Sequence, residues 1–399
     1  MRTDSALSTI IPDTLSSNSQ NRESTAIVEP KRTRLHPPVD AQTRVVERPI
    51  VLCTYKTPPY PLRKAGEVYV ECITDQPHDD EDGNYVVVPG AKLTEGFQVV
   101  KLLGQGGYGR VVAARHRKRK EFVAIKINAL GQGCRDAAMS ELRILQTLRL
   151  NDKENHNRCI HLRRCFEYCG HICMVMDLLG QSTYDFLRDN KFVPFPNSHL
   201  QSFARQLFGS IAFLQDLGLV HADIKPDNIV LCDQAYQTFT YNRMRPSFSA
   251  AKCGQERHAA QRRVLRNTEI RLIDFGLATF QDESPRSFLS TPPYSAPETW
   301  LDLQASFPRD IWSIGCTLVE FFTGDVLFDT VHMPEYLAMI EAVAGLKMEE
   351  EIARAADTKF EGIFSAFFSY AMHGPRKYVK EMGMKHLDVS DYCPNMIWL

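Results

Sequence analysis

Long hydrophobic runs are scarce in this 399-residue sequence, and so is net charge of either sign. The most apolar stretch, residues 311–322, contains Glu320 and is well short of the roughly 20 residues that a membrane-spanning helix needs. Lysine and arginine number 47 against 48 acidic residues, so no global basic field predicts nucleic-acid binding. Eleven cysteines are too few for a disulfide scaffold, and no apolar signal segment opens the chain. These absences predict an intracellular protein with reduced thiols, no membrane contact and no direct contact with nucleic acid.

Residues 1–64 differ in composition from the rest of the chain. They are rich in Ser, Thr, Asn, Pro and Arg and show no sustained apolar period, which predicts a disordered arm. The arm holds ten Lys and Arg against six Asp and Glu, and the basic residues are densest at 31–34. That cluster is either a nuclear-import signal or a solvated basic patch, and the sequence leaves both open.

Short strand-like runs dominate the next part of the chain. Residues 65–96 form an N-terminal extension in which the acidic turn 79–84 and the apolar run behind it predict a short hairpin or edge strand. From residue 97 to 178 the sequence predicts a small unit of β-strands at 98–103, 110–114, 122–127, 164–168 and 171–176. Ala138, Leu142, Leu145 and Leu148 recur at helical spacing, so this unit carries one helix.

Helical patterns dominate residues 179–399. Apolar residues recur with a helical period from Leu200 to Leu214, after an N-cap at 196–198 and before Gly218. Residues 310–322 are apolar nearly all round, which predicts a helix at the centre of a larger helical unit. Residues 233–268 are basic and are interpreted as an insertion between two short strands. An exposed solvated loop is favoured there over a partner-binding surface.

Two motifs, a glycine-rich turn and a strand that ends in lysine, indicate nucleotide binding. Residues 104–111 read GQGGYGRV, and glycines without a Cβ let backbone N–H groups approach phosphates. A dinucleotide-binding turn should open a helix, whereas this one leads into another strand. The order of the VAIK, HAD and DFG motifs described below excludes a dehydrogenase in practice. Lys126 ends a VAIK strand 17 residues after Gly109, as expected of a lysine that grips α- and β-phosphates. Its carboxylate partner is predicted to be Glu141, with an ordinary surface glutamate as the alternative.

Three further motifs complete the pattern of phosphoryl transfer. In 221–228, HADIKPDN, Asp223 is the predicted base that accepts a substrate hydroxyl proton, Lys225 stabilises transition-state charge and Asn228 binds metal. Asp274 of a DFG sequence supplies the other metal carboxylate. An APE sequence at 296–298 closes the activation segment. Five motifs in this order predict a eukaryotic-type protein kinase.

Other residues resemble a particular kinase family. Residues 179–187 (LGQSTYDFL), 192–196 (FVPFP) and 335–345 (EYLAMIEAVAG) are similar to motifs of the LAMMER family, also called Cdc-like dual-specificity kinases, in the CMGC group. The acidic turn at 80–83 and the insertion before Asp274 also resemble that family, and SR-protein kinases are close relatives. The similarity covers about residues 65–385.

The resemblance implies an α+β, bilobal kinase fold: a small β-rich N-lobe with one key helix at 97–178 and a larger, mostly helical C-lobe at 179–399. It implies ATP and Mg²⁺ as cofactors and transfer of the γ-phosphoryl group to Ser/Thr of Arg-Ser-rich splicing factors, with tyrosine autophosphorylation in some members. It further implies a monomer in the nucleus, with the cytoplasm as a second location. Met176 would be the gatekeeper and 177–179 the adenine hinge, while Asp185 and Asp189 would contact basic substrate residues or be solvated. The predicted ATP-binding set is Leu103, Gly104, Gly106, Gly109, Val111, Ala124, Lys126, Met176, Asp177 and Leu179.

Some residues depart from the family pattern. Ala222 replaces the arginine of a typical HRD motif, which is consistent with phosphate-independent activity. Pro292 and Pro293 stand in the substrate-facing loop, so that loop is expected to have a different shape. The chain is expected to lack the final C-lobe helices, in which case Glu298 would lose its buried arginine partner. A pseudokinase-like scaffold or truncated paralogue is therefore the alternative to an active enzyme.

Four cysteines raise the possibility of a zinc site. Cys159, Cys165, Cys169 and Cys173 lack the paired CxxC spacing of structural zinc sites. Scattered thiols are therefore favoured over a metal centre.

Overall fold

The structure is a computed structural model of the whole chain. It describes residues 55, 57–58, 61–66, 68–75, 79–246, 256–283, 290–300, 306–330 and 333–345, with the side chains of 242–246, 256–259, 333, 334 and 344 left aside. Most of the predicted arm, the basic cluster at 31–34 and the chain after residue 345 lie outside this description. The predictions on import and on the last helices therefore stay predictions.

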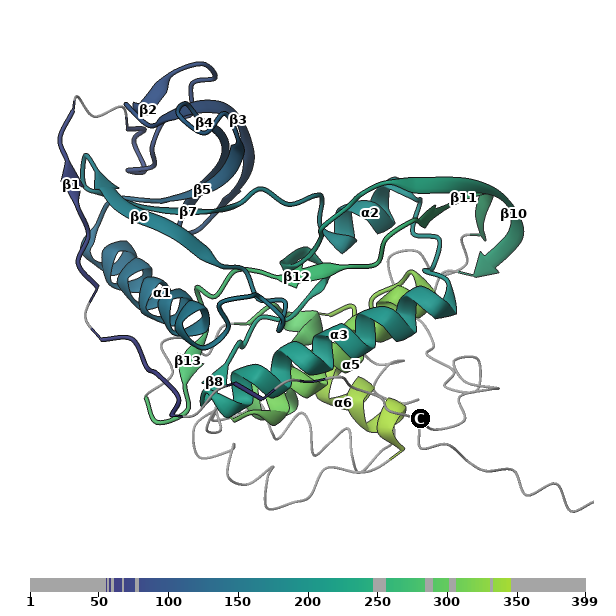
Figure 1. The fold of residues 1–399 in the computed structure, drawn as a ribbon. Coiled ribbons are helices and arrows are strands. Elements are labelled where there is room, and N and C mark those ends of the chain that lie inside the picture. Colours follow the sequence, from purple (N-terminus) through teal and green to yellow (C-terminus); the bar gives the residue numbers. More distant parts are fainter. Residues whose placement is uncertain are drawn as a thin grey trace, which may run out of the picture. The chain divides into compact units, whose positions relative to one another are not determined.

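A seven-stranded sheet forms the first part of the fold, in the order β1-β6-β7-β5-β4-β3-β2 (Figure 1). All neighbours are antiparallel except β1 and β6. The five predicted strands are confirmed with longer bounds. The strands are β1 (Cys72–Ile73), β2 (Lys92–Thr94), β3 (Phe97–Gly106), β4 (Gly109–His116), β5 (Phe122–Asn128), β6 (Leu162–Tyr168) and β7 (His171–Asp177).

The acidic turn at 79–84, between β1 and β2, is closed by one bridge between Asp79 and Tyr85, and no named strand runs through it. Asp80 accepts the N–H groups of Gly83 and Asn84, which ties the turn to itself. The predicted hairpin is therefore limited to this one bridge and the backbone bond from the Asp80 N–H to Asn84, and the Asp80 side chain accepts the Asn84 N–H in place of a longer ladder.

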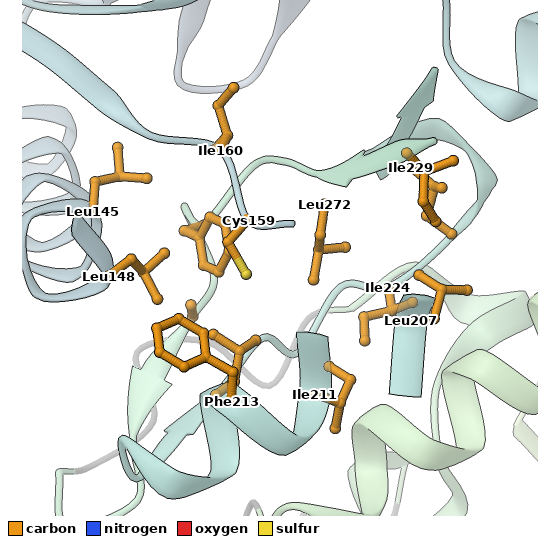
Figure 2. Close-up of a cluster of buried hydrophobic side chains, with 14 of the residues drawn as sticks. Leu145, Leu148, Cys159, Ile160, Leu207, Ile211, Phe213, Ile224, Ile229 and Leu272 are labelled. Carbon is orange, nitrogen blue, oxygen red and sulfur yellow. The ribbon is translucent and has the colours of Figure 1, made fainter. Parts of the chain in front are cut away.

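Helix α1 (Gln132–Asn151) packs against β5, β6 and β7. Its apolar face is buried, and the predicted Ala138, Leu142, Leu145 and Leu148 are all fully enclosed. Figure 2 shows Leu145 and Leu148 of this helix in one apolar cluster with Ile211 and Phe213 of α3 (Asn197–Asp216). The hydrophobic core thus joins the helix of the first part to the helices of the second.

The second part is mostly helical, as predicted. The predicted long helix is α3, although its cap is Pro196, which offers no side-chain cap. The apolar stretch 310–322 lies within α5 (Pro308–Thr323), which ends at Gly324 in the left-handed conformation. The remaining helices are α2 (Thr183–Asp189), α4 (Pro297–Trp300) and α6 (Met333–Ala344), with 3₁₀ turns η1 (Pro226–Asn228) and η3 (Pro292–Tyr294). Within the described ranges, no helix combines the length and the apolar character needed to cross a bilayer.

Two short strand pairs carry the loops of the site. β8 (Leu219–Val220) pairs with β13 (Thr279–Phe280), and β9 (Ile229–Leu231) pairs with β12 (Ile270–Leu272). β9 and β12 are the two short strands predicted to flank the insertion.

The insertion is exposed over residues 233–240, as predicted, but it is a hairpin and not the predicted loop. It forms an antiparallel hairpin of β10 (Tyr236–Pro246) and β11 (Glu256–Leu265). Asn190 exchanges two hydrogen bonds with the backbone of Arg263, and Arg262 donates to the carbonyl of Pro194 at 2.6 Å. The segment is polar and basic, so apolar periodicity did not indicate this hairpin, whose strands are joined by backbone hydrogen bonds and anchored through Asn190 and Arg262.

Candidate active site

The glycine-rich turn joins β3 and β4. Gly104 and Gly106 end β3, and Gly109 opens β4 with φ 134°. A Cβ at Gly109 would lie 2.2 Å from the carbonyl oxygen of Ile127, whereas Gly104 and Gly106 face open space. Gly109 is therefore required by the fold, and the other two leave the backbone free for a close approach by a phosphate.

Arg110, next in the chain, holds this turn in place. Its guanidinium bonds Asp80 at 2.7 Å and the carbonyl of Tyr85 at 2.8 Å. The acidic turn thus supports the base of the glycine-rich turn.

Lys126 and Glu141 meet as predicted. Lys126 on β5 donates to both carboxylate oxygens of Glu141 on α1, at 2.9 and 2.8 Å, and to Asp274 Oδ1 at 2.8 Å. Glu141 is 4% exposed, which rejects the alternative of an ordinary surface glutamate. Burial opposes the charge of Lys126, but the two carboxylates raise its pKa above the ordinary value.

The pKa values of Glu141 and Asp274 shift in opposite directions. Burial raises the pKa of Glu141 against the effect of Lys126. Lys126 holds the pKa of Asp274 below its ordinary value. Asp274 therefore stays ionised near neutral pH, as a metal-binding carboxylate must.

The catalytic loop is hydrogen-bonded to α5 through Asp310. Asp310 is 1% exposed and its carboxylate accepts the backbone N–H groups of His221 at 2.8 Å and Ala222 at 2.9 Å. His221 contacts the carbonyl of Ile273 through Nε2 at 3.0 Å, directly before Asp274. Ala222 has φ 68°, a left-handed conformation that an alanine adopts only under constraint. The role of Asp310 was not predicted, although its position as the carboxylate that opens an apolar helix is a signal for it.

Asp223 lies at the centre of a hydrogen-bond network. Lys225 Nζ bonds Asp223 Oδ2 at 2.7 Å, and Asn228 Nδ2 donates to the same oxygen at 3.0 Å and to the Asp223 carbonyl at 2.8 Å. The hydroxyl of Thr291 donates to Asp223 Oδ1 at 2.8 Å, and Lys225 donates to that hydroxyl at 2.6 Å. Thr291 was not predicted as a site residue. Asp223 is thus arranged to accept a bond from a threonine hydroxyl.

The metal ligands predicted from sequence are Asn228 and Asp274. Because the amide nitrogen of Asn228 is engaged with Asp223, its Oδ1 is the atom left for a cation. The side chain of Asp274 is 47% exposed, whereas Asn228 is buried. Carboxylate and amide oxygens suit a hard divalent cation, which is commonly completed by phosphates and water, so these residues fit such an ion.

The cysteines do not add a metal centre to this set. The described residues contain no grouping of three or more His, Cys, Asp or Glu side chains that could hold a metal. The eight cysteines within the described ranges form no disulfides with one another.

The predicted adenine-side residues share the sheet with Lys126. Ala124 on β5 lies opposite Met176 on β7, Val111 on β4 lies opposite Lys126, and Leu103 on β3 is 43% exposed. Asp177 ends β7, where it pairs with Val123 of β5, and its side chain bonds Arg163 at 2.6 Å. Leu179 follows and packs against the apolar core.

Comparison with known proteins agrees with this geometry. Residues 97–373 match the protein kinase domain. The chain is 39% identical over 343 residues to the dual specificity protein kinase lkh1 of Schizosaccharomyces pombe, covering 83% of this chain and 48% of that protein. It is 41% identical over 276 residues to the dual specificity protein kinase KNS1 of Saccharomyces cerevisiae, covering 68% and 37%. The dual specificity protein kinase CLK4 of Homo sapiens is 36% identical over 283 residues, covering 71% and 56%. The chain therefore spans between about a third and three fifths of the length of these relatives.

Proposed function

The chain belongs to the protein kinase family, with LAMMER-type dual-specificity kinases among its relatives, and from this premise we propose that it transfers the γ-phosphoryl group of Mg-ATP to serine and threonine hydroxyls of proteins. One observation carries the proposal: Asp223, within 2.7 Å of Lys225, accepts a threonine hydroxyl at 2.8 Å. This is the arrangement a substrate hydroxyl would need to lose its proton to Asp223.

The other site residues have separate roles. Mg-ATP supplies the phosphoryl group when bound. Lys126, held by Glu141, orients phosphates, and Asn228 with Asp274 holds the cation. Lys225 stabilises negative charge beside Asp223. Since these contacts are all formed, the alternative of a scaffold without turnover gains no support from the site.

We further propose that the substrates are basic, with Arg-Ser-rich splicing factors as the class implied by the family resemblance. Helix α2, which carries Asp185 and Asp189, contacts η1 of the catalytic loop, and both carboxylates bind the guanidinium of Arg188, at 2.7 and 3.3 Å. A substrate arginine would compete for the same carboxylates. A nuclear location follows as a proposal from that substrate class and from the basic cluster at 31–34.

Purified protein incubated with Mg-ATP tests both proposals. An Arg-Ser repeat peptide is compared with a peptide in which glutamate replaces each arginine, beside Lys126→Met and Asp223→Asn variants. We expect phosphate transfer to the Arg-Ser peptide that both variants lose. Turnover no higher than that of the variants would reject the kinase proposal, and equal use of the two peptides would reject the basic-substrate proposal alone.

A further inference from the structure

Three charged side chains from distant segments meet at the start of the activation segment. Arg143 of α1 bonds Glu283 at 2.5 Å, and Lys64, from the segment before the sheet, lies 3.2 Å from the other carboxylate oxygen of Glu283. Lys64 also lies 3.3 Å from Asp282. We call Lys64, Arg143 and Glu283 the clamp.

The cationic side of the clamp is fixed to α1. Asn151 accepts the N–H of Arg63 at 2.9 Å and donates to its carbonyl at 2.7 Å. The N–H of Ala65 donates to the Thr147 hydroxyl at 3.0 Å, in a buried contact. The backbone on both sides of Lys64 therefore runs along the helix that carries Arg143 and Glu141.

The anionic side is fixed to the second part of the fold. Thr279–Phe280 pairs with β8, and the N–H of Gln281 donates to the carbonyl of Gly218. Lys64 Nζ lies 3.9 Å from the centre of the Phe280 ring, and the Arg143 guanidinium lies 5.0 Å from it. Both cations thus add a cation–π contact to the ion pairs.

The clamp joins two elements that must be aligned for Lys126 to meet both carboxylates. Glu141 is on α1, two residues before Arg143, and Asp274 precedes the segment that contains Glu283. In other kinases a phosphate on the activation loop supplies the negative charge that pairs with arginines. In this chain Ala222 occupies the position of that arginine beside Asp223. Glu283 instead places a permanent negative charge against Arg143 and Lys64.

We propose that Arg143 and Lys64 are positioning residues that lock α1 to the activation segment through Glu283 and so keep Glu141 against Lys126 without a phosphate. This rests on the proposed kinase function. The carboxylate takes the place of a phosphorylation event in ordering the segment. None of the three clamp residues touches the reacting atoms.

The test compares Glu283→Gln, Arg143→Gln, Lys64→Gln and the double variant Arg143→Gln/Glu283→Gln with the unaltered full chain. We expect each of Glu283→Gln and Arg143→Gln to lower kcat about 3- to 10-fold, and the double variant to be no worse than either single change. Arg143→Lys, which keeps the charge, should recover at least about half of the activity. Hydrogen exchange of the α1 amides should rise about threefold or more in the glutamine variants.

A matched ion pair supplies the control. Arg158 and Glu269 are 3.3 Å apart with similar exposure, Glu269 also lies 3.4 Å from Arg271, and neither Arg158 nor Glu269 belongs to α1 or to the activation segment. Glu269→Gln should leave kcat and α1 exchange unchanged. Clamp variants that behave like Glu269→Gln, or effects of the two single changes that simply add, would overturn the proposal while leaving the kinase function intact. If Glu283→Gln does not fold, the same comparison is made with Lys64→Gln, whose side chain is 42% exposed.

Discussion

The hydroxyl of Thr291 donates a hydrogen bond to Asp223 Oδ1 at 2.8 Å, across 68 residues of sequence. The same hydroxyl accepts a bond from Lys225 at 2.6 Å. The segment that precedes Pro292 and Pro293 is therefore attached to the catalytic loop at the residue proposed to act as base. The two prolines form the 3₁₀ turn η3 directly behind this contact.

Thr291→Val tests that attachment. Valine has nearly the same shape but no hydroxyl, so Asp223 and Lys225 lose their shared partner, and we expect kcat to fall about tenfold with little change in thermal midpoint. Thr291→Ser keeps the hydroxyl and should retain most of the activity. Steady-state kinetics on an Arg-Ser peptide measures both. Full activity of the valine variant would show that the contact is dispensable.

Asp310 offers a prediction about stability. Its buried carboxylate is the acceptor for two backbone N–H groups of the catalytic loop, and Asp310→Ala would leave both without a partner. Each buried unsatisfied donor costs about 1–3 kcal/mol, so we expect the two together to lower the unfolding free energy, measured by urea denaturation, by about 2–6 kcal/mol. Asp136→Asn, at an exposed position of α1, is the control and should change little. A loss below about 1 kcal/mol would contradict the prediction.

The motifs of the site were predictable from sequence because each is local. Lys126, Asp223, Asn228 and Asp274 each stand in a short pattern whose spacing is dictated by phosphate and metal chemistry, although only the fold shows that Glu141 reaches Lys126. Contacts between distant segments carry no such pattern. Thr291 meets Asp223, and Arg143 meets Glu283, only after the chain has folded.

The hairpin β10–β11 was missed for a different reason. Its sequence is polar and basic, and the alternation that predicts strands depends on a buried face. A ladder of backbone hydrogen bonds needs no such face, so the arginines of the segment indicated a loop. Apolar periodicity therefore predicts which residues form the core, but it does not reveal strand pairs that lack an apolar pattern.

Gly109 gives a steric prediction. Because a Cβ there would lie 2.2 Å from the carbonyl oxygen of Ile127 and φ is 134°, Gly109→Ala must displace β5 or distort the turn. We expect a lower thermal midpoint and about tenfold weaker ATP binding by calorimetry. Gly107→Ala is the matched change, since nothing lies within 4 Å of its position, and it should leave the thermal midpoint unchanged. Equal midpoints for the two variants would contradict the steric argument.

The pKa of Asp274 gives a prediction on pH. Lys126 lowers this pKa below the ordinary 3.8, so the folded protein binds this proton less readily than the unfolded chain. The ionised carboxylate therefore contributes stability that is complete above pH 3.8 and is lost as the pH falls through the lowered value. Asp274→Asn removes the charge but tolerates the left-handed backbone, φ 61°, at this position. The urea midpoint of the asparagine variant should lie further below that of the unaltered chain at pH 7 than at pH 3.5. A deficit that is the same at both values would mean that Lys126 does not stabilise the charged form.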